Sequence, residues 1–195
     1  MTPRRGGVRV GAAGAVLVAV ALVAVLAGCG GGGEVEVAPP RVADTLAPAE
    51  VAGGLKLYEN TAESTRKAIA DAGERTLAAD ARIWEIRRAD RLVGALQITT
   101  VLPQVDLRDA EVRRAIGRQI IPGAVTRIRI DAIEVLTREV NDKAVFLWFG
   151  DGMYEVLQVK DRELQGRYED VAAAVIRHQA TVPAWKPLPE VLEAA

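Results

Sequence analysis

The 195-residue sequence predicts an α+β domain: an antiparallel sheet of about five strands with helices packed on it. Two kinds of periodicity support this fold class. Several segments alternate apolar and polar residues, as strands do, and other segments place apolar residues every three or four positions, as helices do. The turns between the strand segments are too short for crossover connections, so neighbouring strands should run antiparallel. In chain order the elements are expected to follow the pattern α-ββ-α-βββ-α.

The first part of this pattern is one helix and one hairpin. Asn60, with Glu63 three residues later, resembles a capping box that opens a helix, and Gly73 is expected to close it. Residues 81–88 (ARIWEIRR) and 92–101 (LVGALQITTV) are rich in β-branched and aromatic residues on either side of a short polar turn. This composition predicts two paired strands.

Two further helices are predicted. One begins with a cap at Asp106 and continues to Ile120, and its apolar stripe has arginines largely on the opposite side. The other runs from about Leu164 to Gln179, with apolar residues on one side of the helix.

Between these helices we expect a three-stranded meander. The strands are residues 126–140 (TRIRIDAIEVLTREV), 143–149 (KAVFLWF) and 153–160 (MYEVLQVK), with turns at Asn141–Asp142 and Gly150–Gly152. The middle strand is apolar on both faces, which is typical of a central strand covered from both sides.

The N-terminus has the pattern of a secretory signal peptide. Arg4, Arg5 and Arg9 precede a stretch from Val10 to Gly33 that contains no charged residue. An uncleaved transmembrane anchor is the alternative, because residues 10–27 are just long enough to span a bilayer.

One cysteine decides between these two interpretations. Leu26-Ala27-Gly28-Cys29 resembles the lipobox of bacterial lipoproteins, and Cys29 is the only cysteine in the chain. The resemblance implies that the Cys29 thiol carries a diacylglycerol, that the signal is cleaved between Gly28 and Cys29, and that acyl chains hold the protein to a membrane at its extracytoplasmic face. The partner of Cys29 would thus be the lipid bilayer. Two or three acyl chains anchor a protein firmly, whereas one binds only marginally.

Two weaker resemblances accompany the lipobox. The Ala-, Val- and Arg-rich composition resembles that of proteins from high-GC actinobacteria. The order of predicted elements is similar to the PsbP-like fold of some mycobacterial lipoproteins.

The chain is therefore divided into four parts: a signal peptide (1–28), a Gly/Pro-rich tether (29–54), one α+β domain (55–181) and a Pro-rich tail (182–195). Removal of the signal peptide takes away three arginines and changes the net charge from −1 to −4. With Cys29 acylated, no cysteine remains for a disulfide, so the core alone must hold the fold. A flexible tether of this length would span on the order of 25 Å.

Two short segments have alternative interpretations. The EVEV sequence at residues 34–37 could add an edge strand instead of continuing the tether. The tail is expected to pack back on the domain through Trp185, and the alternative is an extended Trp-Lys-Pro-Leu-Pro segment that docks a partner.

The residues that could carry catalysis have simpler structural explanations. Ser64 is the only serine and His178 the only histidine, so a Ser-His-Asp triad would need this pair, yet each is expected in a terminal turn of a different helix. A zinc site lacks ligands, and Asp151 between two glycines is explained by a turn rather than by calcium. A carboxylate pair for glycan hydrolysis stays open, although only 4% of the residues are aromatic and could stack on sugars.

Two clusters of arginines are expected to be solvated, with contact to anionic lipid headgroups as the alternative. The net negative charge argues against nucleic acid as a partner. The clusters are Arg87, Arg88 and Arg91, and Arg113, Arg114 and Arg118.

The prediction for function is a membrane-anchored, non-catalytic binding or accessory module of the cell envelope, without a cofactor or metal. Its partner would be an envelope protein or a hydrophobic ligand. A pocket between the sheet and its helices would be lined by Trp84, Phe146, Trp148 and Phe149, unless these side chains simply form the core. A hydrolase acting on envelope glycan or lipid and a purely structural interaction protein are the alternatives.

Overall fold

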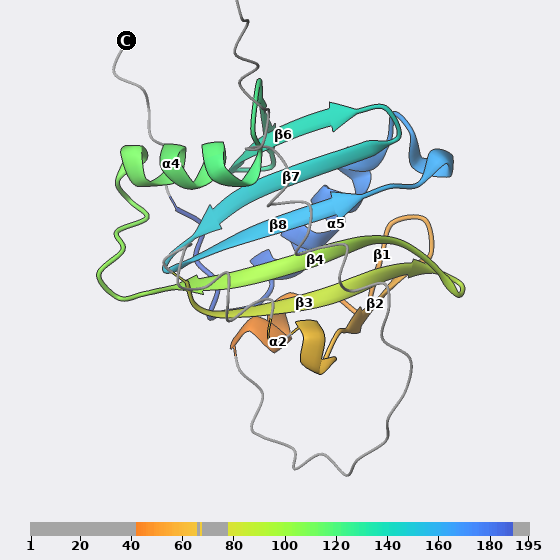
Figure 1. Cartoon of the computed structure of the whole chain (residues 1–195), viewed down its shortest axis with the longest axis horizontal. Coiled ribbons are helices and arrows are strands. Elements are labelled where there is room, and N and C mark those ends of the chain that lie inside the picture. Colours follow the sequence, from red (N-terminus) through yellow and green to blue (C-terminus); the bar gives the residue numbers. More distant parts are fainter. Residues whose placement is uncertain (1–41, 66, 68–77, 189–195) are drawn as a thin grey trace, which may run out of the picture.

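The computed structural model describes residues 42–65, 67 and 78–188 and confirms the α+β class. Its centre is one antiparallel sheet of eight strands, in the order β1-β2-β3-β4-β8-β7-β6-β5 (Figure 1). The predicted number of about five strands is therefore wrong. The strands are β1 (Glu50–Val51), β2 (Leu55–Glu59), β3 (Ala78–Arg88), β4 (Arg91–Val101), β5 (Thr126–Ile130), β6 (Ile133–Val140), β7 (Lys143–Gly150) and β8 (Met153–Val159).

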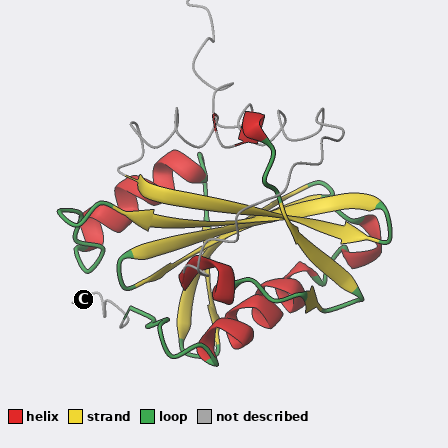
Figure 2. Cartoon of the chain, turned by 90° about the horizontal axis from the view of Figure 1, so that it is seen from below, coloured by secondary structure: helices red, strands yellow, loops and turns green. Residues whose placement is uncertain are grey.

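Helices lie on both faces of this sheet (Figure 2). On one face, α5 (Tyr168–Ala180) packs with the short α2 (Val42–Leu46), and on the other face lies α4 (Ala110–Ile120). A 3-10 turn, η2 (Arg162–Leu164), connects β8 to α5. Two apolar cores result, a larger one under α5 and a smaller one under α4.

The predicted hairpin and the last two meander strands are confirmed. β3 pairs with β4 along almost its whole length, and β8 lies between β4 and β7. The turn at Asn141–Asp142 places Asn141 at φ +59°, and Gly152 has φ +73° in the next turn. Both residue types tolerate this left-handed conformation better than most, which is why these turn sequences were informative.

The segment 126–140 is two strands rather than the single strand predicted. It folds into the β5–β6 hairpin, in which Ile130 pairs with Ile133 around Asp131 and Ala132. Asp131 adopts φ +52°, a left-handed conformation that aspartate reaches at low cost. The apolar positions change phase here, from Ile128 and Ile130 to Ile133 and Val135, and the prediction of a single strand missed this break in the alternation.

Residues 42–54, which were predicted to belong to the tether, contain α2 and β1. Ala43 and Leu46 of α2 are buried in the larger core, and Val51 of β1 pairs with Leu55 of β2. Gly53 and Gly54 have φ values of +77° and +71°, so they form the turn of a hairpin rather than the end of a linker. The described part of the domain therefore begins before Leu55.

The helices differ from the prediction mainly at their ends. Asp109, not Asp106, caps α4 by accepting a hydrogen bond from the Glu111 N–H, while Asp106 accepts from Arg108 N–H in a turn. The last helix begins at Tyr168 rather than Leu164, because Gly166 at φ +76° separates it from η2.

The predicted first helix is described only at its start. Glu63 to Thr65 are helical, and Asn60 Oδ1 accepts from the Ala62 N–H. Lys67 is also helical, but Arg66 and residues 68–77 lie outside the described residues. The signal peptide, Cys29 and the segment 34–37 lie outside them as well.

The start of the C-terminal tail packs on the domain, as predicted. Pro187 forms a bridge with Gly150, Asp151 N–H donates to the Lys186 carbonyl at 2.8 Å, and Trp185 is buried. We refer to residues 182–188 as the C-terminal strap. Because Trp185 is part of the core, it is not presented to a partner, and the alternative interpretation of this tryptophan as a docking residue is wrong.

Candidate functional site

The four residues predicted to line one pocket are all buried, but they lie on two faces of the sheet. Trp84, Phe146 and Trp148 belong to the core under α5, whereas Phe149 belongs to the core under α4. Phe149 follows Trp148 directly in β7, and successive residues of a strand point to opposite faces. The four side chains therefore do not line a common pocket, and they act as core residues.

Two buried polar pairs lie between the sheet, α5 and the C-terminal strap. Trp148 Nε1 donates to Gln179 Oε1 of α5 at 3.0 Å, and Trp185 Nε1 donates to Glu155 Oε1 of β8, also at 3.0 Å. Trp148 and Glu155 are directly paired across β7 and β8. The two bonds thereby attach α5 and the strap to neighbouring positions of the sheet.

Glu155 is the most perturbed acid in the described residues. Its side chain is fully buried, and the atom Oε2 has no hydrogen-bond partner among them. Burial raises the pKa of Glu155 to about 8, against a smaller lowering effect of the Trp185 hydrogen bond. The carboxyl group is therefore largely protonated at neutral pH. It has no contact with solvent, so it cannot act on a dissolved substrate.

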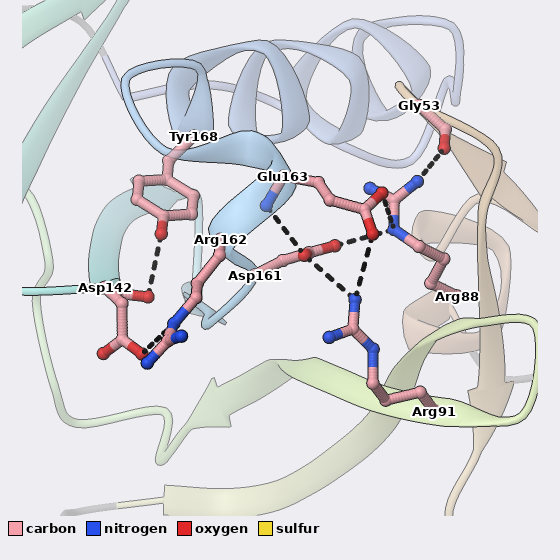
Figure 3. Close-up of polar contacts among 8 residues, drawn as sticks. All are labelled: Gly53, Arg88, Arg91, Asp142, Asp161, Arg162, Glu163 and Tyr168. Carbon is pink, nitrogen blue, oxygen red and sulfur yellow. Dashed lines mark hydrogen bonds and ion pairs between the residues drawn. The ribbon is translucent and has the colours of Figure 1, made fainter.

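A second polar cluster ties the β3–β4 turn to η2 (Figure 3). The buried Asp161 accepts from Arg88 Nε at 2.8 Å, from Arg91 Nη2 at 3.1 Å and from the Glu163 N–H at 3.1 Å. Glu163 also lies within ion-pair distance of both arginines, and Arg88 Nη1 donates to the Gly53 carbonyl. We call Asp161, Glu163, Arg88 and Arg91 the Asp161 cluster.

The charges within the Asp161 cluster cancel, and its contacts act as a brace that holds the β3–β4 turn against η2. Burial raises the pKa of Asp161, but the Arg88 and Glu163 hydrogen bonds and the charges of Arg88 and Arg91 outweigh burial, so the net pKa is lowered. Two carboxylates balance two guanidinium groups. The nearby Arg87 is paired with Glu85 at 2.6 Å. This arginine cluster is thus neither merely solvated nor set up to attract anions.

Next to this cluster, a tyrosine links α5 to the β6–β7 turn. Tyr168 Oη donates to the Asp142 carbonyl at 2.8 Å, and the Asp142 carboxylate lies 4.0 Å from Arg162 Nε (Figure 3). Burial and the charge of Glu139 raise the pKa of Tyr168. The contacts in this region position secondary structure.

Two of the remaining candidate residues, His178 and Asp151, have structural contacts. Nε2 of His178 lies 3.0 Å from the Thr45 carbonyl and so connects α5 to α2. Ser64 is exposed in the short helical stretch. Asp151 is exposed in the β7–β8 turn, and its carboxylate lies 3.4 Å from Arg108 Nη2.

In residues 42–65, 67 and 78–188, no three His, Cys, Asp or Glu side chains gather into a potential metal site, and no helix is long and apolar enough to cross a membrane.

Two acids with perturbed pKa values, Glu155 and Asp161, were not among the predicted site residues. Glu155 could have been noticed as a single charge at an inward position of an otherwise apolar strand, between Met153 and Leu157. Asp161 stands between Lys160 and Arg162 and looks like a surface residue, so no local pattern announces its burial.

Comparisons with known proteins add no assignment: no protein-family model, curated protein or solved structure matched the chain.

Proposed function

We propose that the chain is a lipid-anchored extracytoplasmic lipoprotein whose α+β domain is a non-catalytic binding or accessory module of the cell envelope. The observation that carries this proposal is the sequence Leu26-Ala27-Gly28-Cys29 at the end of an uncharged run that follows three arginines. Acyl chains on Cys29 would hold the domain at a membrane surface.

Several contacts in the described residues support a binding role over a catalytic one. The perturbed acid Glu155 is enclosed in the core, and Asp161 is saturated by Arg88, Arg91 and a backbone N–H. Groups that serve catalysis need access to a substrate as well as a perturbed pKa. In this domain the perturbed carboxyl groups hold the strap and a hairpin instead.

The alternatives lead to different partners. A hydrolase of envelope glycan or lipid would need two exposed carboxylates at the spacing of a glycosidase or an exposed nucleophile. A purely structural lipoprotein would bind other envelope proteins without a ligand. Crosslinking in living cells separates the hydrolase from the other two classes, because an accessory or structural role predicts a dominant protein partner.

The anchor is tested with Cys29→Ala. We expect this variant to lose labelling by radioactive palmitate. It should either remain an uncleaved precursor or be released from the membrane. Its thermal unfolding should equal that of the wild type, because Cys29 precedes the folded domain. A Cys29→Ala protein that is processed and membrane-bound like the wild type would exclude the lipid anchor.

A further inference from the structure

One corner of the sheet is rich in arginine. Residues 112–130 contain five arginines and no carboxylate. They comprise most of α4, the connection to β5, and β5 itself, which is an edge strand. We define the α4–β5 corner by its exposed or half-exposed residues Arg118, Pro122–Val125, Arg127, Arg129, Arg138 and Val140.

These side chains lie on the face of the sheet that α4 covers. Arg127 pairs with Leu136 of β6, and Leu136 packs on the core under α4. Arg138 and Val140 follow Leu136 at steps of two residues, so they point to the same face. Arg138 Nη1 also donates to the Pro122 carbonyl, which joins β6 to the connection after α4. Figure 1 shows α4 crossing the sheet next to β6 and β7.

An apolar tip lies among these arginines. Pro122, Gly123, Ala124 and Val125 are all exposed. Of the three large exposed hydrophobic side chains in the described residues, two are here: Val125, 40% exposed, and Val140, 46% exposed. Since Thr126 pairs with Thr137, Val125 and Val140 lie at the same end of the β5–β6 hairpin. An exposed apolar group with a basic surround is typical of surfaces that bind membranes.

The charge balance separates this corner from the Asp161 cluster. There, two carboxylates match two arginines. At the corner, four arginines share the face with Glu134, which lies 3.8 Å from Arg127. Glu139 is close in sequence but acts on Tyr168 under α5, on the opposite face. By formal charge, the described residues of the corner are therefore net positive, whereas the whole chain has a net charge of −1.

We propose that the α4–β5 corner docks on an anionic phospholipid bilayer. The arginines would bind lipid phosphates, and Val125 and Val140 would enter the headgroup layer. This inference rests on the proposed lipid anchor, which brings the bilayer within reach. The 12 residues between Cys29 and Val42 allow a separation of at most about 45 Å. A second copy of the chain fits poorly as the occupant, because β5 against β5 would oppose arginines to arginines.

The test is hydrogen exchange of the full, membrane-purified protein reconstituted into two kinds of vesicle. One contains only phosphatidylcholine, and in the other about a third of the lipid is phosphatidylglycerol. We expect the backbone amides of residues 119–127 to exchange more slowly in the anionic vesicles, and added salt to remove this protection. The β3–β4 turn at 88–92 should not change.

Two variants and one matched control sharpen the test. Each arginine near an anionic surface strengthens binding about fivefold, so Arg118→Gln with Arg127→Gln should weaken docking by roughly 25-fold and abolish the protection. Val125→Ser removes the apolar contact without altering charge and should weaken it too. Lys56→Gln with Lys186→Gln removes the same charge from exposed positions elsewhere and should leave the protection intact.

The outcomes distinguish this inference from the anchor. Fast exchange of residues 119–127 in both kinds of vesicle would overturn the docking surface. If intact mass then shows that Cys29 is lipidated, the anchor is still supported. Protection in both vesicles alike would also overturn the docking surface, because it would point to a protein contact or self-association. An unmodified Cys29 would refute the anchor, while the two vesicle compositions would still decide the corner.

Discussion

Among single residues, Glu155 shows how burial can outweigh a hydrogen bond in setting a charge state. Its carboxyl group receives one hydrogen bond from Trp185 and is enclosed by the sheet, α5 and the strap. The folded-state pKa of about 8 is higher than the usual 4.5. The folded protein therefore binds a proton more tightly than the unfolded chain, so Glu155 should cost stability as the pH rises from about 4.5 through 8.

Glu155→Gln should remove this cost, because a neutral amide keeps an oxygen for the Trp185 N–H. We expect the variant to gain stability relative to the wild type at pH 8.5 and to gain little at pH 5. Chemical denaturation at the two pH values measures the difference. Glu169→Gln, on the exposed side of α5, controls for the loss of a surface carboxylate. A wild type and variant whose stabilities change in parallel with pH would contradict the assigned pKa.

Asp161 has the opposite linkage. Its pKa is lowered in the folded state, so its contribution is present at neutral pH and is lost as the pH falls through the folded-state pKa. Asp161→Ala leaves Arg88 and Arg91 without their buried acceptor and should cost about 2 kcal/mol at pH 7. Thermal and urea unfolding measure this loss. Glu163→Ala removes only the exposed partner and should cost much less; equal losses would refute the brace.

At the scale of elements, alternation and turn residues predicted β3, β4, β7 and β8. The β5–β6 turn was not predicted, because Asp131 enters the left-handed region without a glycine, and the mark of the turn is a change of phase between Ile130 and Ile133. Nor did alternation and turn residues place α2 and β1 in the domain. A two-residue strand has no period of its own, and it exists because β2 pairs with it and Leu46 fills the core beside it.

The C-terminal strap packs closely on Gly150, where a side chain would not fit. A Cβ on Gly150 would lie 2.9 Å from Trp185 Nε1 and 3.3 Å from the Lys186 carbonyl oxygen. Gly150→Ala should therefore push the strap outward and destabilise the domain by about 1–3 kcal/mol. Limited proteolysis should then cleave near residues 182–188, and tryptophan fluorescence should shift to longer wavelength. Asp151→Ala, exposed in the same turn, should do neither, and an equally protected strap in Gly150→Ala would argue against the contact.

At the scale of the whole molecule, the contacts that matter join residues distant in sequence. The prediction of one aromatic pocket was wrong, because Phe149 faces the core under α4 and the other three residues face α5. Four aromatic residues suggested a pocket, but the placement of α4 and α5 on opposite faces of the sheet decides which residues share a core. The same placement brings Arg118, Arg127 and Arg138 to one surface. Because they come from separate segments, this could not be predicted from the sequence.

The proposed anchor would determine how this surface meets its surroundings. A domain tethered through Cys29 can present the α4–β5 corner to the bilayer, and the rest of its surface to an envelope partner. The most direct measurement is mass spectrometry of the N-terminal peptide of the protein isolated from its native membrane. The account predicts a peptide that begins at Cys29 and carries a diacylglycerol. A peptide that begins at Met1, with a free thiol at Cys29, would contradict it.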